Sequence, residues 1–259
     1  MPRGRAGIIT GTTITATRMR MPKRTTTPMA DTALYSLLTW MSPAWPIGAF
    51  AHSGGLEWAV EASHVIDMAS CGEWLADLLG HGALHNDAVL FVHAWRAASA
   101  EDGERLAEVA ELAVASQTGF ERHLEATAQG AAFRRIAVAT AGSDRFDGLL
   151  GGLDDADLAY PVAAAVQCAC NGVALEAALT AFLHAAVANL VSAAQRLVPL
   201  GQTDGQRLLR DLAPAVFALA ARAIALPDED PFTQLSTCTL LAELGCMAHE
   251  TQYTRLFRT

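Results

Sequence analysis

Two histidines have the clearest spacing for metal chemistry in this chain. His81 and His85 are four residues apart, a separation that can place two imidazoles on one face of a helix, and Asp87 and His93 follow nearby. Imidazole nitrogens suit a transition metal, but a stable site needs three or four ligands. Gly82 lies between the two histidines and weakens a helix that would fix them. The spacing therefore leaves two interpretations open, a metal-binding pair or ordinary solvated and core histidines.

Motifs of other catalytic classes are missing from the sequence. It has no serine-centred elbow, phosphate loop or dinucleotide fingerprint, and the pair His249-Glu250 lacks the second histidine of an HExxH zinc motif. No nucleophile, base and oxyanion site can be assembled from what remains. We therefore expect a protein that is not an enzyme. The alternative is a small helical metalloenzyme that uses His81, His85 and acids from a facing helix.

The last eleven residues, HETQYTRLFRT, have an unusual composition for a chain end. Tyr253, Leu256 and Phe257 alternate with Arg255 and Arg258, whereas a disordered tail is poor in aromatics. Burial of three such side chains stabilises by about 1.5–3 kcal/mol each. Ordering the backbone costs about 1–2 kcal/mol per residue. The tail (residues 249–259) thus needs additional hydrogen bonds or a partner surface; the alternative is a last amphipathic helix docked on its own core.

Charge is distributed unevenly along the chain. Of its 259 residues, 52% are hydrophobic and only 17% charged, which suggests surface reserved for another protein. Six of the 18 basic residues and none of the 27 acidic ones lie in residues 1–30, so residues 31–259 carry a net charge of −15. This acidity argues against nucleic acid as a partner and favours a basic partner or a cation in transit.

The first thirty residues and the cysteines bear on cellular location. Residues 1–30 are rich in Thr and Arg and lack the apolar run of a signal peptide, so we expect a disordered basic extension or a mis-called start. A transit peptide is the third possibility. The five cysteines are odd in number and have no framework spacing, which is typical of reduced thiols in a cytoplasmic protein.

Apolar residues recur three and four positions apart, and strand patterns are nearly absent. The pattern predicts an all-α fold, a single compact multi-helix domain over residues 31–259, with an apolar central hairpin and a C-terminal docking tail. The predicted helices start after the capping residue Asp31 and then cover 56–62, 67–79, 86–98, 101–115, 118–141, two helices within 158–195, 204–223 and a last helix from Thr239. A loop rich in Pro and Gly, 43–55, separates the first two, and its Trp45, Ile47 and Phe50 should pack inward or against a partner.

One segment raises the possibility of a membrane span. Nineteen residues between Glu176 and Arg196 carry no charge, which is long enough to cross a bilayer. Many of them are alanine, however, and His184 and Asn189 interrupt the run. A buried helical hairpin is the interpretation we adopt, and a membrane-embedded hairpin over 158–195 is the alternative.

Three separated segments resemble signatures of the UreF family of urease accessory proteins. The first is SPAWPIGAFAHSGGLEWAVE at 42–61, the second is RLVPLGQ at 196–202, and the third is HETQYTRLFR at 249–258. They occur in the family's order, and the similarity extends over roughly Ala33 to Thr259. The tail motif is the most specific of the three.

The resemblance implies an all-helical scaffold that is not itself a catalyst. Family members bind the accessory protein UreD (also called UreH), and the complex recruits the nickel-carrying GTPase UreG. That assembly delivers nickel to the active site of apo-urease. The resemblance also implies a homodimer within the complex, a tail that helps to hold UreD, and no stably bound cofactor, because nickel is handled only transiently.

Family residues carry over by position. The first signature is matched by Pro43, Pro46, Gly48, Ser53, Gly55, Leu56 and Glu57, the second by Pro199, Gly201 and Gln202, and the tail by Glu250, Tyr253, Arg255, Leu256 and Phe257, to which we add Arg258 as a partner-binding residue. Three positions depart from the family pattern. Ala248 replaces a usual arginine, Arg196 stands where lysine is common, and Gly54 stands where glutamine or histidine is usual. Because the usual arginine is absent at position 248, an inference of a nickel route lined by arginine is weakened.

Overall fold

The computed structural model describes residues 29–141, 143–236 and 238–259, in which all regular structure is helical and no strand occurs. The α-helices are α1 (Met29–Trp40), α2 (Leu56–Glu61), α3 (Met68–His81), α4 (Ala83–Ala100), α5 (Gly103–Ala115), α6 (Gly119–Thr140), α7 (Asp144–Leu150), α8 (Tyr160–Cys170), α9 (Leu175–Leu197), α10 (Gln202–Ala225) and α11 (Leu240–His249). Short 3₁₀ turns are η1 (Ala49–Ala51), η2 (Asp155–Asp157) and η3 (Pro231–Gln234). The all-α class predicted from the sequence is confirmed.

Helix α1 begins slightly earlier than the sequence predicted. Met29 and Ala30 already belong to α1, so Asp31 lies inside the helix and does not precede it. Alanine is the best helix former, and Ala30 extends the helix towards the N-terminus. The rest of the expected basic extension, residues 1–28, lies outside the described residues.

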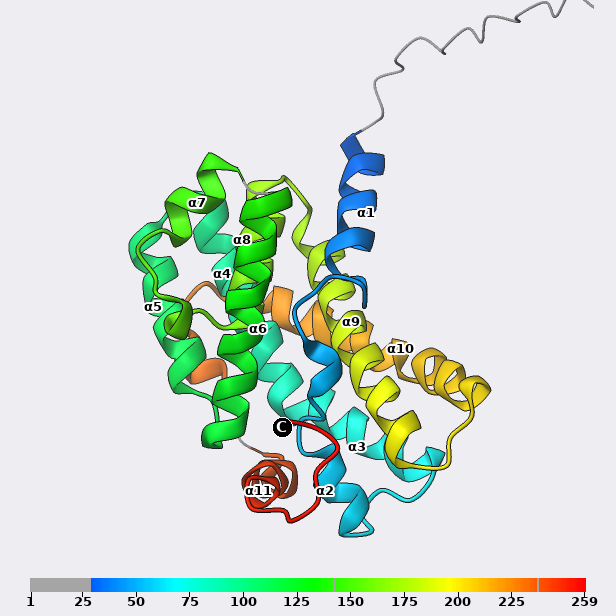
Figure 1. The fold of residues 1–259 in the computed structure, drawn as a ribbon. Coiled ribbons are helices and arrows are strands. Elements are labelled where there is room, and N and C mark those ends of the chain that lie inside the picture. The colour runs from blue at the N-terminus through cyan, green and yellow to red at the C-terminus, as the bar shows by residue number, and fades with distance from the viewer. Residues whose placement is uncertain (1–28, 142, 237) are drawn as a thin grey trace, which may run out of the picture.

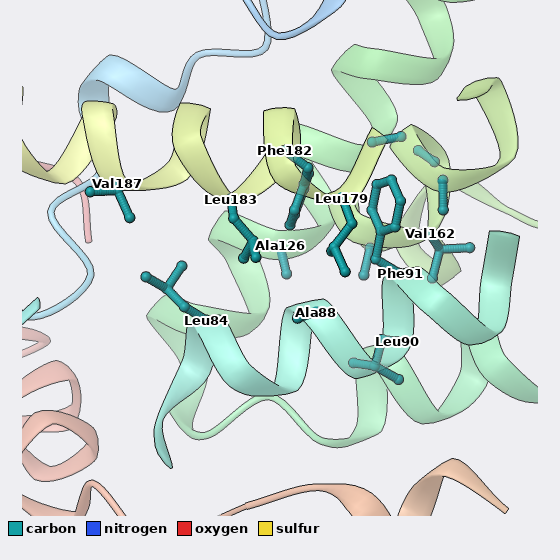
Figure 2. Packing of buried hydrophobic residues seen from close by; sticks show 14 of the residues in the cluster. Leu84, Ala88, Leu90, Phe91, Ala126, Val162, Leu179, Phe182, Leu183 and Val187 are labelled. Atoms are coloured by element: carbon teal, nitrogen blue, oxygen red, sulfur yellow. The ribbon is translucent and has the colours of Figure 1, made fainter. Parts of the chain in front are cut away.

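Helix α8 occupies the centre of the fold. It packs against α4, α6 and α9, and every residue from Pro161 to Ala169 is buried. Small side chains along α8 let its neighbours approach closely. Larger side chains fill the space between α4 and α9, where the rings of Phe91 and Phe182 lie 5.0 Å apart between centroids and Leu84 and Leu183 pack nearby (Figure 2).

Helix α9 is long and apolar enough to cross a membrane by length and composition alone. Half of its most apolar stretch is buried inside the fold, and it packs against α10, α4 and α8. These contacts are those of a core helix in a globular protein.

Helix α2 and the C-terminal tail, which are far apart in the sequence, lie at one end of the molecule. Helix α11 packs against α2 and α6, and the tail runs past α2 (Figure 1). Helix α1 projects from the opposite end (Figure 1). The short helix α2 therefore lies between the tail and the loop of the first signature (residues 43–55, called the first-signature loop below).

Candidate functional site

The first signature and the tail meet around the carboxylate of Glu57. This residue of α2 is only 7% exposed. Its Oε1 accepts the backbone N–H of Leu256 at 2.6 Å, and its Oε2 accepts that of Phe257 at 2.9 Å. A buried carboxylate without donors is costly, and hydrogen bonds to a charged group are stronger than neutral ones. Glu57 thus ties the first signature to the backbone of the tail.

A second carboxylate, from α6, completes this cluster. Nδ1 of His249 lies 2.7 Å from Oε2 of Glu121, and Nε2 lies 3.0 Å from Oε2 of Glu57. Arg255 donates from its guanidinium to Oε1 of Glu121 at 2.8 Å. All three of His249, Glu57 and Glu121 are buried. Two acids and one imidazole are therefore enclosed at the junction of α2, α6 and α11, and the partly exposed guanidinium of Arg255 covers them.

Glu250 holds the start of α6. Its Oε1 accepts the backbone N–H of Phe120 at 2.8 Å, in the first turn of that helix. An acidic group at a helix N-terminus satisfies an otherwise unpaired N–H and interacts favourably with the helix dipole. The preceding Gly119 has φ +82° and lets the chain turn there.

The final residues attach to the first-signature loop. The backbone N–H of Ser53 donates to the carbonyl of Thr259 at 2.6 Å, its hydroxyl donates to the same oxygen at 2.8 Å, and Arg258 N–H donates to the carbonyl of Ala51. His52 contacts the hydroxyl of Thr259 at 2.7 Å. Burial lowers the pKa of His52, an effect that the nearby carboxylate of Glu125 opposes.

The middle signature reaches the tail through one side chain. The guanidinium of Arg196 lies 3.7 Å from the ring centroid of Phe50 and 4.2 Å from that of Phe257. It also donates to the carbonyl of Phe50 at 3.0 Å. A planar guanidinium can stack on two rings, which a lysine ammonium does less well. Burial lowers the pKa of this arginine.

These contacts correct the expectation for the tail. The sequence left open whether a partner or additional hydrogen bonds hold it, and in the structure hydrogen bonds from its own fold do so. Phe257 is buried at 4% exposure, and Glu250 and Arg255 are engaged with α6. Tyr253 and Leu256 remain on the surface, fully and 64% exposed respectively. The tail is neither a last helix nor a free segment.

The other members of the signatures have different places. Pro43, Pro46 and Gly48 are exposed, whereas Leu56 is completely buried in α2. Pro199 and Gly201 lie in the turn between α9 and α10, Gln202 is the first residue of α10, and all three are exposed. Within the middle signature, Arg196 alone belongs to the cluster described above.

A cavity of about 460 Å³ lies beside the cluster, between the first-signature loop, α4, α6, α9 and α11. Its wall includes Asp87, Arg122 and Glu125. Burial raises the pKa of Asp87 to about 6. Burial alone would lower the pKa of Arg122, but the neighbouring carboxylates of Glu125 and Asp87 raise it above its usual value. The cavity is thus mainly apolar with one group of ionised side chains.

The proposed histidine pair does not share a helix. His81 ends α3 and His85 lies in α4, with the break at Gly82, whose N–H closes the last turn of α3. His81 is exposed, and Nε2 of His85 contacts the carbonyl of Gln234 at 3.2 Å. Among residues 29–141, 143–236 and 238–259, no group of three or more His, Cys, Asp or Glu side chains could hold a metal ion. The metal-binding interpretation of this pair, one of the two that the sequence left open, therefore has no shared helix face to support it.

Sequence reasoning missed the residues of α6. Glu121, Arg122 and Glu125 were assigned only to a predicted helix, yet Glu121 and Glu125 contact the tail and Arg122 pairs with Glu125. The one available signal was local: three charges within five residues of an otherwise alanine-rich segment. The role of His249 also follows only from the tertiary structure.

Two glycines of the first signature should respond differently to substitution. Gly48 and Gly55 both have positive φ, +81° and +82°. A Cβ on Gly48 meets nothing within 4 Å, whereas one on Gly55 would lie 2.8 Å from Sγ of Cys246. We expect Gly48→Ala to cost about 1–2 kcal/mol of unfolding free energy from the backbone angle alone. Gly55→Ala should cost roughly 1–3 kcal/mol more because of overpacking. Urea denaturation measures both, and equal losses would contradict the close packing of α2 on α11.

Adjacent tail residues provide a second matched pair. Phe257→Ala should reduce the unfolding free energy of the isolated protein by about 3–5 kcal/mol, because a buried ring is lost. Leu256→Ala, one position earlier and exposed, should change it by less than about 0.5 kcal/mol. Chemical denaturation measures the unfolding free energy of both variants. If the two variants are equally stable, the tail is not part of the folded core.

Comparisons with known proteins agree with the resemblance. The family model described as UreF matches residues 65–213. A protein of Rhodopseudomonas palustris strain HaA2, named urease accessory protein UreF, is 50% identical over 242 residues, which is 92% of this chain and 100% of that protein. A protein of the same name from Bradyrhizobium sp. strain ORS 278 is 49% identical over 88% of this chain and 92% of its own length. The chain belongs to the UreF family of urease accessory proteins.

Proposed function

We propose that this protein is a non-catalytic urease maturation factor whose tail and α11 dock a partner protein. The relatives that cover nearly its whole length are named accessory proteins of urease. The observation that carries the proposal is the outward-facing pair Tyr253 and Leu256 on a tail whose backbone is held by Glu57. Exposed apolar side chains on an ordered backbone are typical of a binding surface.

The docking surface extends beyond the tail. Helix α11 buries Ala242, Gly245 and Cys246 and leaves its other face open. The exposed large side chains in and beside this face are Leu240, Leu241, Leu244 and Met247 of α11, Phe120 of α6, and Tyr253 and Leu256 of the tail. Because the backbone of α11 and of the tail is already ordered, binding of a partner would cost little conformational entropy in this protein. We call these seven residues the docking surface.

We assign this surface to UreD (UreH), following the resemblance of the tail to its family signature. The joint complex would recruit the GTPase UreG and bring nickel to apo-urease, with this protein as a homodimer in the complex. Nickel is then a cargo and not a resident cofactor. The acidic balance of residues 31–259 suits a cation in transit. All five cysteines lie in the described ranges and form no disulfide there, which suits the cytoplasm.

We do not favour the alternative function, a helical metalloenzyme that uses His81 and His85. Its two imidazoles come from separate helices. No observation on α3 or α4 favours it over the maturation role.

Binding of the partner can be tested on the docking surface directly. Tyr253→Ala and Leu256→Ala should each weaken binding to UreD by about 30-fold, the effect of losing an interface hot spot of about 2 kcal/mol. Their melting temperatures should match the wild type, because both side chains are exposed. Phe217→Ala removes an exposed aromatic side chain on α10; it is the control and should bind normally. Normal binding by both tail variants would refute the assigned surface.

Point variants are preferable to a truncation after Ala248. Removal of residues 249–259 would leave Glu57 and Glu121 buried without their donors. Such a truncation would lower stability as well as binding. Its effect on a partner could not be attributed to either cause.

The maturation role itself is tested in cells. In a strain without this protein, urease should accumulate as a nickel-poor apoenzyme, and the wild-type chain should restore nickel content and activity. The Tyr253→Ala and Leu256→Ala variants should restore little of either, and Phe217→Ala should restore both. Normal nickel content in the deletion strain would contradict the proposed function.

A further inference from the structure

The cavity beside the tail contains a carboxylate that has no partner in the fold. Asp87, in the second turn of α4, lines this cavity. Within the described part of the chain, no N–H or O–H group donates a hydrogen bond to its carboxylate and no basic side chain forms an ion pair with it. Burial raises the pKa of Asp87 to about 6, and the more distant charge of Arg122 opposes this effect only in part. The carboxylate is therefore poorly compensated.

The accessible part of Asp87 faces the cavity. Asp87 keeps some accessible surface although it lies deep enough for burial to raise its pKa, and the surface beside it is that of the cavity. Two other polar atoms of the cavity wall, Nε1 of Trp45 and Oγ1 of Thr239, are buried and have no hydrogen-bond partner among the described residues. A buried polar group costs free energy until it is paired. A polar ligand in the cavity would pair these groups.

The charges of the cavity wall are unbalanced. Its acidic side chains are Asp87, Glu125 and Glu243, and its one basic side chain among the described residues is Arg122. Arg122 already forms an ion pair with Glu125, with 2.6 Å between N and O. The sign of the excess charge is negative, so the wall favours a cation.

Aromatic rings form another part of the same wall. Trp45, Tyr160 and Phe182 line the cavity, and the ring centroids of Tyr160 and Phe182 lie 5.2 Å apart. Burial raises the pKa of Tyr160, and the charges of Cys168 and Asp87 add to this effect, so the phenol and the Asp87 carboxylate are close enough to interact. Aromatic faces attract ammonium and guanidinium groups. Rings and a carboxylate together suit an organic cation.

The wall does not suit a metal ion. Among residues 29–141, 143–236 and 238–259, no group of three or more His, Cys, Asp or Glu side chains could hold one. Burial raises the pKa of Cys246 to about 12, so this thiol of the wall stays neutral, and His184 is exposed. The volume of about 460 Å³ lies within the range of about 300–1,000 Å³ that is typical of sites for small organic molecules.

We propose that the cavity binds an organic cation, an ammonium or guanidinium group on a short aliphatic stem, through Asp87 and the rings beside it. The N–H groups of the cation donate to the carboxylate, and the hydroxyl of Thr239 is a second acceptor in the wall. The cation is either a free amine or a basic side chain of a bound protein. This inference stands whether or not the docking surface binds UreD.

The test uses n-butylammonium, which has the structure of a lysine side chain, and 1-butanol, an uncharged molecule of nearly the same size. Each is titrated into the full-length chain at about pH 7.5, where the amine is protonated and Asp87 is ionised, and binding is followed by the NMR signal of the Trp45 indole N–H. n-Butylammonium should bind saturably, and 1-butanol at least about tenfold more weakly. Absence of saturable binding of n-butylammonium, or equal binding of the two molecules, would overturn the proposal.

A matched pair of variants locates the site. Asp87→Asn should weaken binding of n-butylammonium at least about tenfold, because the charge is removed and the shape is kept. Asp77→Asn, which changes an exposed acid on α3, should leave the affinity unchanged. Unchanged affinity in Asp87→Asn would refute the assigned residue.

Thermal stability distinguishes a binding role of Asp87 from a structural one. Without ligand, the melting temperature of Asp87→Asn should equal or exceed that of the wild type, because an unpaired buried charge is removed. A large decrease would show that the carboxylate has a partner within the fold, which contradicts the proposal.

Binding of UreD to Asp87→Asn distinguishes the two sources of the cation. A basic side chain of UreD in the cavity predicts that this variant binds UreD more weakly than the wild type and that n-butylammonium competes with UreD. A free amine predicts unchanged binding of UreD.

Discussion

A buried carboxylate must be surrounded by donors, and in this protein Glu57 imposes that requirement on the end of the chain. Glu57 lies on a six-residue helix between the first-signature loop and α11. Two backbone N–H groups and one imidazole satisfy it. Each hydrogen bond to a charged group contributes about 1.5–3 kcal/mol, whereas burial of Phe257 alone could not order ten residues of chain. This side chain therefore contributes most to the position of the tail, together with the contacts that Ser53, Glu121 and Ala51 make with it.

This arrangement separates two roles within a short segment. Backbone groups and Phe257 face inward and fix the tail, while Tyr253 and Leu256 face outward. The stacking of Arg196 between Phe50 and Phe257 adds the middle signature to the same assembly. Three motifs that lie far apart in the sequence thus serve one structure. A partner would meet a surface that is already formed.

The sequence allowed much of the fold to be predicted, because the relevant signals are local. A helix was expected to begin at Asp67, and the Asp67 side chain accepts the N–H of Ser70 at the start of α3. Alanine-rich segments with apolar residues at helical spacing gave the all-α class. The site was harder to predict. The break at Gly82 overrode the spacing of His81 and His85, and the pairing of His249 with Glu57 and Glu121 joins residues 192 and 128 positions apart. No local pattern contains such a contact.

The central claim is that the Glu57 carboxylate, and not apolar burial, holds the tail in the free protein. Glu57→Gln keeps the size of the side chain but directs an NH₂ group at a backbone N–H that needs an acceptor. Hydrogen–deuterium exchange of this variant tests the claim most directly. We predict fast exchange throughout residues 250–259, with unchanged protection in the central helices α4 and α8. Protection of the tail equal to that of the wild type would contradict the account.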